Sequence, residues 1–156
     1  MSVQAKRRAD YQPPAFSIAT VDLHITLHPT QTKVTSTLSV TRSGTHNEPL
    51  VLDGDNLSLD TIAIDGKSLS SSEYTVTDCG LRVNTELDNF VLEITNTIAP
   101  EHNKALEGLY LSGGAYCTQC EAEGFRRITF FMDRPDVLAV YTVTVVADKS
   151  VPMLLA

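Results

Sequence analysis

The sequence has no tryptophan, and no apolar run approaches the roughly 18–20 residues that a membrane-spanning helix needs. Basic residues are also few, since 12 Lys and Arg stand against 19 Asp and Glu, for a net charge of −7. Binding to phosphates requires a concentrated basic patch. We therefore expect neither nucleic acid nor an anionic membrane surface as a partner, and we interpret the acidic balance as a contribution to solubility.

The chain has only three cysteines, and they do not form a disulfide framework or a metal site. Cys117 and Cys120 make one C-x-x-C, and Cys79 lies far from them. Zinc needs about four ligands at defined spacing, and the four histidines are scattered. A redox C-x-x-C would sit at a strand-to-helix junction of a βαβ unit, of which the sequence shows no sign. We interpret both residues as packing residues and predict no metal site in this chain.

The cysteine usage and the N-terminus together predict a cytoplasmic protein. Free thiols suit a reducing compartment. The basic cluster near the N-terminus is not followed by an apolar segment, so we expect no secretory signal. The motifs H-E-x-x-H, G-x-S-x-G and the P-loop are absent as well. By its own motifs, the chain contains no complete active site.

Helical periodicity is missing over the first hundred residues, where β-branched residues and period-two alternation dominate. Strands separated by turn signals about every 8–12 residues are typical of an all-β sandwich or curved sheet. The predicted strands cover residues 16–27, 34–40, 50–52, 57–59, 62–64, 74–77, 81–83, 90–94 and 140–146. A phase shift in the first strand, near Ala19 and Thr20, predicts a β-bulge.

Turn signals and composition define the remaining organisation. Asp65-Gly66 and residues 78–80 predict hairpin turns, and residues 101–105 and 133–138 predict short helical turns. Residues 1–15 form a predicted mobile arm, stiffened by two prolines, and residues 16–156 a single β domain. The apolar last residues, 151–156, favour either a following strand or domain that covers them, or a terminal strand packed into this domain.

Unusual residues are concentrated between Leu106 and Asp136. If residues 119–123 are extended, Gln119, Glu121 and Glu123 point the same way. A carboxamide beside a carboxylate is a suitable receptor for an ammonium group, and the alternative is that these are solvated surface groups. Before them, a double glycine at 113–114 permits a sharp turn, and after them Asp133 and Arg134 are expected to pair.

Three segments of this stretch carry a specific resemblance. They are residues 105–110 (ALEGLY), 117–126 (CTQCEAEGFR) and 132–137 (MDRPDV). They closely resemble the N-terminal domain of bacterial aminopeptidase N, a zinc metallopeptidase of the H-E-x-x-H type. The resemblance extends from Arg8 to Lys149 and so covers nearly the whole chain.

The resemblance implies an elongated, curved, saddle-like antiparallel β domain that packs against its own catalytic domain. Gln119 and Glu121 match the family's Gln-x-Glu, which binds the free α-amino group of a peptide substrate and lines the pocket for its first residue. Zinc and its ligands would come from the catalytic domain, whose motifs these 156 residues lack. The 156-residue chain alone is then expected to be inactive. The alternative is a self-standing β-sandwich binding or interaction module without catalysis.

Overall fold

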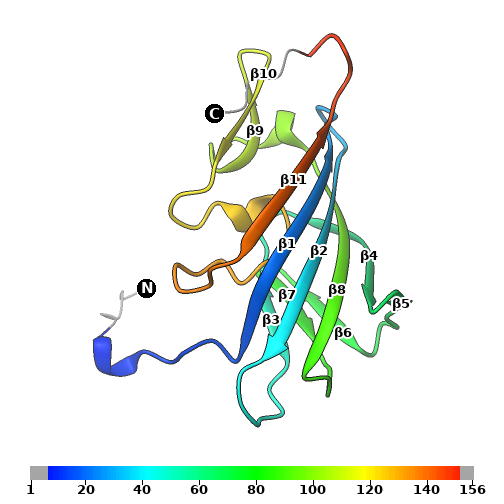
Figure 1. Ribbon diagram of the computed structural model, residues 1–156. Helices are drawn as coiled ribbons and strands as arrows, with labels where there is room; N and C mark the ends of the chain where they lie inside the picture. Colours follow the sequence, from blue (N-terminus) through cyan, green and yellow to red (C-terminus); the bar gives the residue numbers. More distant parts are fainter. Residues whose placement is uncertain (1–6, 152–156) are drawn as a thin grey trace.

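The computed structural model describes residues 7–151, and these form an elongated all-β structure, as predicted (Figure 1). The strands are β1 (Phe16–Thr26), β2 (Thr32–Arg42), β3 (Leu50–Asp53), β4 (Ser58–Ile64), β5 (Lys67–Ser68), β6 (Tyr74–Thr77), β7 (Gly80–Val83), β8 (Asn89–Ile98), β9 (Gly108–Ser112), β10 (Ala115–Gln119) and β11 (Val140–Val146). Three single-turn 3-10 helices are η1 (Arg8–Asp10), η2 (Pro100–His102) and η3 (Phe125–Arg127). Within the described range, no helix has the length and apolarity to cross a membrane.

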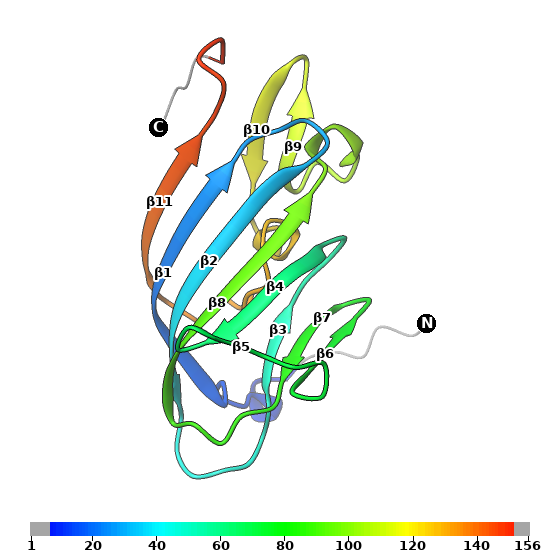
Figure 2. The ribbon, with the colours of Figure 1, turned by 90° about the vertical axis from the view of Figure 1, so that its right-hand side faces the viewer.

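The strands form one large sheet and two small ones. The large sheet has the order β11-β1-β2-β8-β4-β5, and the small sheets are β3-β7-β6 and the β9–β10 hairpin. Figure 2 shows the large sheet curving past both small sheets, which lie on the same side of it. The segment around η3 (amber) runs between the two small sheets.

One strand pair departs from the predicted antiparallel arrangement. β11 pairs with β1 in parallel, with Thr20 opposite Val140 and Thr26 opposite Val146. A parallel pair needs a long connection that returns the chain to the same end of the sheet. The whole chain between β1 and β11 provides that connection. Alternation within residues 140–146 predicted the strand, but a local pattern carries no information about its direction relative to β1.

The core lies between the large sheet and the structure that covers its inner face. Alternate residues of β1, β2 and β8 point inward, so that Val21, Leu38 and Leu92 are almost fully buried. Leu50 and Leu81 of the small three-stranded sheet are equally buried against them. The outer face is polar and rich in Thr and Ser, as expected for a sheet with one solvated face.

Two polar contacts attach the segment after η3 to the inner face of the large sheet. The Asn96 side-chain amide donates to the carbonyl of Ile128 at 3.0 Å, and the Ser36 and Thr129 hydroxyls are 3.1 Å apart. Asn96, Ser36 and Thr129 are all fully buried. A buried polar group is costly unless it is paired, so these contacts select one position for the segment.

The predicted bulge and turns are present. The β1–β2 register shifts between Ile18 and Thr20, which keeps both Ile18 and Val21 in the core. Asp65 and Gly66 both have positive φ, at 49° and 76°, as a two-residue hairpin turn of type I′ requires. Residues 113–114 also both have positive φ and form the β9–β10 turn.

The two predicted helical turns have different outcomes. The first is present as η2, shifted to begin at Pro100. The second was wrong, because residues 133–138 contain only a turn at Pro135 and Asp136. Pro135 has no backbone N–H to donate within a helix. The neighbouring 3-10 helix is η3 instead, which precedes the expected position.

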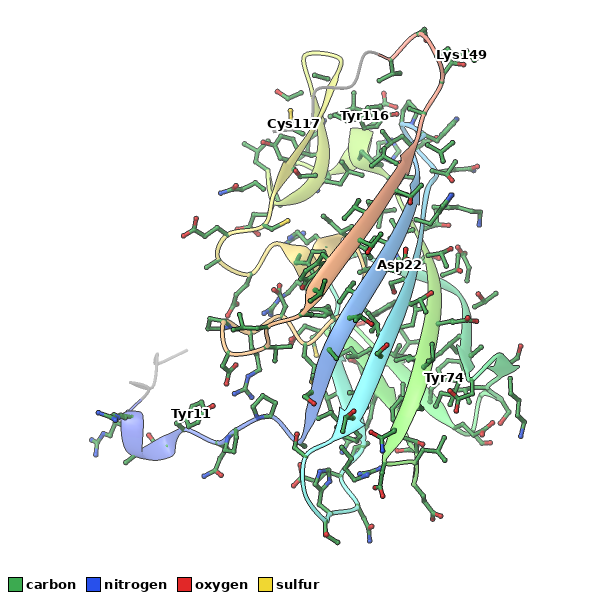
Figure 3. All side chains as sticks on the ribbon, in the orientation of Figure 1. Tyr11, Asp22, Tyr74, Tyr116, Cys117 and Lys149 are labelled. Atoms are coloured by element: carbon green, nitrogen blue, oxygen red, sulfur yellow. The ribbon has the colours of Figure 1, made fainter. Side chains whose placement is uncertain are left out.

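The described part of the predicted arm, residues 7–15, is hydrogen-bonded to the rest of the molecule. The Tyr11 hydroxyl donates to Asp136 Oδ2 at 3.0 Å, and Arg134 Nη2 donates to the Gln12 carbonyl at 3.0 Å. Figure 3 shows Tyr11 on the arm, beyond the end of β1. Residues 1–6 and 152–156 lie outside the described range, and so do most of the apolar last residues singled out above.

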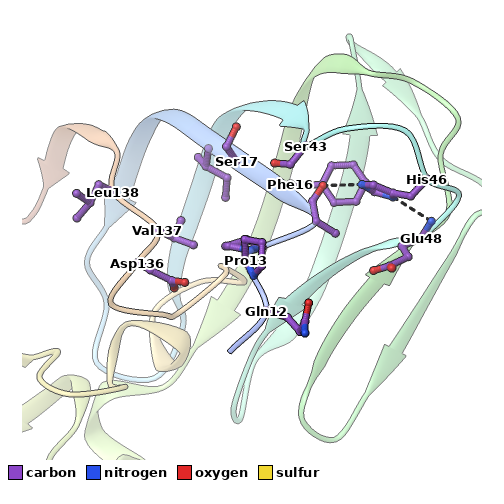
Figure 4. Close-up of a pocket in the computed structure, with 13 residues that line it drawn as sticks. Gln12, Pro13, Phe16, Ser17, Ser43, His46, Glu48, Asp136, Val137 and Leu138 are labelled. Carbon is purple, nitrogen blue, oxygen red and sulfur yellow. Dashed lines mark hydrogen bonds between the residues drawn. The ribbon is translucent and has the colours of Figure 1, made fainter. Parts of the chain in front are cut away.

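A groove of about 640 Å³ lies between this arm and the end of the large sheet (Figure 4). Pro13, Phe16 and Leu138 contribute its apolar surface, and His46 lies across it from the loop of Leu138. His46 Nε2 donates to the Ala15 carbonyl at 2.8 Å, because that carbonyl can only accept. This bond attaches the arm to the opposite wall of the groove.

Candidate functional site

The β9–β10 hairpin brings the predicted binding residues to the end of a strand. Gln119 is the last residue of β10 and pairs with Gly108, the first residue of β9. The chain then turns over residues 121–124, where the Gly124 N–H donates to the Cys120 carbonyl at 2.8 Å. The peptide bond between Glu121 and Ala122 is cis.

Because of this turn, residues 119–123 are not extended throughout, so the condition for one shared face is not met. Gln119, Glu121 and Glu123 are all exposed, but only Gln119 belongs to a strand. The extended conformation ends because the chain folds back into η3 within five residues. Alternation continues for one step, since Cys120 is directed into the core between the two exposed residues.

Cys120, directly before the turn, packs against the core. Its side chain is half-buried. Burial, together with the nearby Asp133 carboxylate, raises the pKa of the Cys120 thiol. A neutral thiol is a poor nucleophile, which agrees with a packing role. Cys117 lies on β10 (Figure 3), and the three cysteines are free within the described residues.

The acidic side chains of the turn differ in their partners. The Glu123 carboxylate lies 3.4 Å from Arg126 Nη2. Within residues 7–151, the side chains of Gln119 and Glu121 have neither a hydrogen-bond partner nor an ion-pair partner. An exposed carboxylate and an exposed carboxamide, two residues apart, therefore keep their acceptor oxygens for solvent or a ligand.

Arg126 connects the turn to two distant acidic residues. Its backbone N–H and its Nε both donate to Asp133 Oδ2, at 3.1 and 3.0 Å, and its Nη2 donates to the Asp133 carbonyl at 3.0 Å. Asp53 Oδ1 lies 3.8 Å from Nη1, and Asp53 also accepts from the Asp133 N–H at 3.0 Å. Burial opposes the charged guanidinium, but the bond to Asp133 and the charges of Asp53 and Glu123 outweigh it and raise the pKa of Arg126.

The predicted Asp133–Arg134 pair is therefore wrong. Asp133 pairs with Arg126, and Arg134 pairs with Asp136 through two nitrogens at 2.9 and 2.7 Å. The bond from Arg134, with a smaller contribution from Tyr11, lowers the pKa of Asp136 to about 2. Adjacent residues on an extended chain point to opposite sides, so Asp133 and Arg134 reach different partners.

Two glycines that sequence reasoning missed allow the turn to pack closely. A Cβ on Gly124 would lie 2.4 Å from the Gln119 carbonyl oxygen. Gly108 has a φ of 69°, and a Cβ there would lie 2.6 Å from the Cβ of Arg127. The turn thus folds directly onto the start of β9. No sequence signal specified these contacts, although both glycines fall within the segments that carry the resemblance.

An aromatic cluster joins η3 to β11. The ring centroids of Phe125 and Phe131 are 5.1 Å apart in an edge-to-face arrangement, and Tyr141 lies 5.8 Å from Phe125. Burial and the nearby Asp133 and Cys120 raise the pKa of Tyr141. The cluster holds the segment that carries Arg126 against the edge strand of the large sheet.

Metal ligands do not converge at this site. Across the described part of the chain, no group of three or more His, Cys, Asp or Glu side chains is arranged to hold a metal ion. The described residues therefore do not fit a zinc centre. Gln119 and Glu121 do not line the groove beneath the arm either, so they lie on an open surface.

Comparison with known proteins identifies the family. The profile described as the peptidase M1 N-terminal domain matches residues 11–155. The chain belongs to this family. It is 54% identical over 153 residues to aminopeptidase N of Caulobacter vibrioides, and 43% identical over 146 residues to aminopeptidase N of Escherichia coli. These alignments cover 98% and 94% of this chain but only 18% and 17% of the two relatives.

Solved structures agree with this M1 N-terminal domain assignment. An aminopeptidase A of Legionella pneumophila, determined in complex with aspartic acid, superposes with a TM-score of 0.81 at 31% identity, covering 90% of this chain and 17% of that one. An M1 zinc metallopeptidase of Deinococcus radiodurans, bound to a Tyr-Ser-Ala substrate, superposes with a TM-score of 0.69 at 22% identity, covering 85% and 33%. The second likeness shows the fold alone. The predicted resemblance and the all-β fold are confirmed.

Proposed function

We propose that this M1 N-terminal domain is part of a zinc-dependent aminopeptidase, in which Gln119 and Glu121 bind the free α-amino group of the peptide substrate. The observation that carries the proposal is a contrast among neighbouring polar residues between 119 and 123. Glu123 is paired with Arg126, whereas the acceptors of Gln119 and Glu121 are exposed and without protein partners in residues 7–151.

The chemistry of an exopeptidase suits this pair of acceptors. A peptide N-terminus has a reference pKa of about 8 and is largely protonated near neutral pH. A carboxylate accepts from the ammonium with charge assistance, and a carboxamide oxygen accepts a further hydrogen. Binding the ammonium at a fixed distance from the scissile carbonyl places that carbonyl for attack. The same contact rejects an internal peptide nitrogen, which is uncharged.

The whole protein would complete the site with a catalytic domain. Solved relatives are described as zinc metallopeptidases, and this chain spans less than a fifth of the curated relatives. Zinc bound by that domain would polarise the scissile carbonyl. On this chain, β11 and the loop before it offer an apolar surface for contact, with Leu138 of the loop 85% exposed and Val140 and Val143 of β11 70% and 54% exposed.

The test is Glu121→Gln in the longer protein that contains this chain. Loss of the carboxylate leaves the bound ammonium under-paired, so kcat/KM for aminoacyl reporters should fall. The fall should correspond to a loss of about 2–5 kcal/mol in transition-state binding. The matched control is Glu93→Gln, on the solvated face of β8, which should leave the kinetics unchanged. Zinc content should equal that of the wild type in both variants. Wild-type kinetics for Glu121→Gln would contradict the proposal.

The 156-residue chain alone is expected to be inactive, because its motifs include no catalytic apparatus. Clear hydrolysis of an aminoacyl reporter by the pure chain would contradict this expectation. We also propose a cytoplasmic location, supported by the three free cysteines. Fractionation of the source cells, with detection of this chain by antibody, tests the location independently of activity.

A further inference from the structure

We infer that Arg126 is a positioning residue for substrate binding, which acts by holding the turn of residues 121–124, which contains Glu121 and follows Gln119 closely. The inference rests on the proposed function of those two residues. The sequence assigned no role to Arg126, and it predicted that Asp133, the main partner of Arg126, pairs with Arg134 instead.

The geometry fixes the end of the turn from two sides. Asp133 receives the backbone N–H and the Nε of Arg126 on one oxygen, and its side chain is only 11% exposed. On the other side, Arg126 Nη2 lies 3.4 Å from Glu123, within the turn itself. Since a guanidinium is planar, these contacts also restrict the direction of the side chain. Glu121 lies only two residues before Glu123, so its backbone is held with the turn.

The same contacts select which carboxylate remains available. Glu123 is drawn towards Arg126, and Glu121 is left without an ion-pair partner in the described residues. The single positive charge of Arg126 is surrounded by three carboxylates, those of Asp53, Glu123 and Asp133. The surroundings of the turn therefore remain negative, which favours a cationic ligand.

The neighbouring Arg127 is a matched control. Its side chain is 20% exposed, against 24% for Arg126, and it pairs with two carboxylates where Arg126 pairs with three. Those carboxylates are Asp55 and Glu107, which lie outside the turn of residues 121–124. The two arginines are thus adjacent and similarly buried, and each is paired with carboxylates, three for Arg126 and two for Arg127, but only Arg126 pairs with a side chain of the turn.

A double-mutant cycle in the longer protein separates positioning from general stability. Arg126→Gln should lower kcat/KM for an aminoacyl reporter by about tenfold in an otherwise wild-type protein. In a Glu121→Gln background it should have little further effect, within about twofold, because the group that it positions is already removed. Arg127→Gln should have the same effect with or without Glu121→Gln.

Two further variants keep the test independent of folding. Arg126→Lys retains the positive charge but not the planar set of N–H donors of the guanidinium. Its kcat/KM should therefore lie between those of Arg126→Gln and the wild type. Asp133→Asn removes the main partner while conserving its shape, and should show the same non-additivity with Glu121→Gln. Additive effects of Arg126→Gln and Asp133→Asn with Glu121→Gln would overturn the inference. Wild-type kinetics for Glu121→Gln alone would instead overturn the proposed function, so the two failures are distinguishable.

Discussion

The large sheet and the turn at residues 121–124 are stabilised in different ways. The sheet buries every second residue of its central strands, and its stability comes from many similar apolar contacts. The turn buries little and is held by a few specific contacts, chiefly those of Arg126 and Gly124. Many interchangeable contacts make a rigid platform, whereas few specific ones set the position of particular side chains. The residues proposed to bind substrate lie where the alternation of buried and exposed residues ends.

The largest effect on stability should come from the sheet. Leu92→Ala in β8 removes a fully buried side chain, which should lower the free energy of unfolding by about 2–5 kcal/mol. The control is Val91→Ala, the adjacent residue, whose side chain points to the solvated face and is 37% exposed. Denaturant unfolding of both variants measures the difference. Equal losses would contradict the assignment of the two faces.

Gly124→Ala should break the turn while leaving the sheet intact. The added Cβ would meet the Gln119 carbonyl oxygen at 2.4 Å, so the backbone must shift, at a cost of about 1–3 kcal/mol. Because Gln119 and Glu121 would move with it, kcat/KM of the longer protein should fall by more than the stability loss explains.

The matched control is Gly113→Asn, at the tip of the same hairpin. A Cβ there meets open space, and Asn tolerates the positive φ of 58°. It should change neither stability nor kinetics appreciably. If both variants behaved alike, close packing of the turn would not be what positions the site.

The smallest effect should come from the contact between the arm and the turn at residues 135–136. Arg134, with Tyr11, lowers the pKa of Asp136 from 3.8 to about 2, so the folded state favours the charged carboxylate. This contribution is present above pH 3.8 and is lost as the pH falls through about 2. Asp136→Asn should therefore be less stable than the wild type at pH 6, and the difference should vanish near pH 2. Denaturant unfolding of the two proteins at pH 6 and near pH 2 measures the difference, and an equal loss of stability at both pH values would contradict this prediction.

Local signals predicted most of the platform. The bulge after Ile18 could be predicted because a change of phase is visible along the chain itself. The Asp65-Gly66 and double-glycine turns could be predicted because they need residues that tolerate positive φ. The end of the extended segment at Gln119 could not, because nothing in residues 120–123 interrupts alternation. The chain turns there because Gly124 fits against β9.

The sequence by itself determined the all-β class, the hairpins and the membership of Gln119 and Glu121 in one short exposed segment. Only the tertiary structure decided the parallel pairing of β11 and the choice of Asp133 as the partner of Arg126. Periodicity and turn preference depend on residues a few positions apart, so they can be seen in the chain. Contacts between distant residues depend on distance in space, and Asp53 accepts from the N–H of Asp133, 80 positions further along the chain, only once the chain has folded.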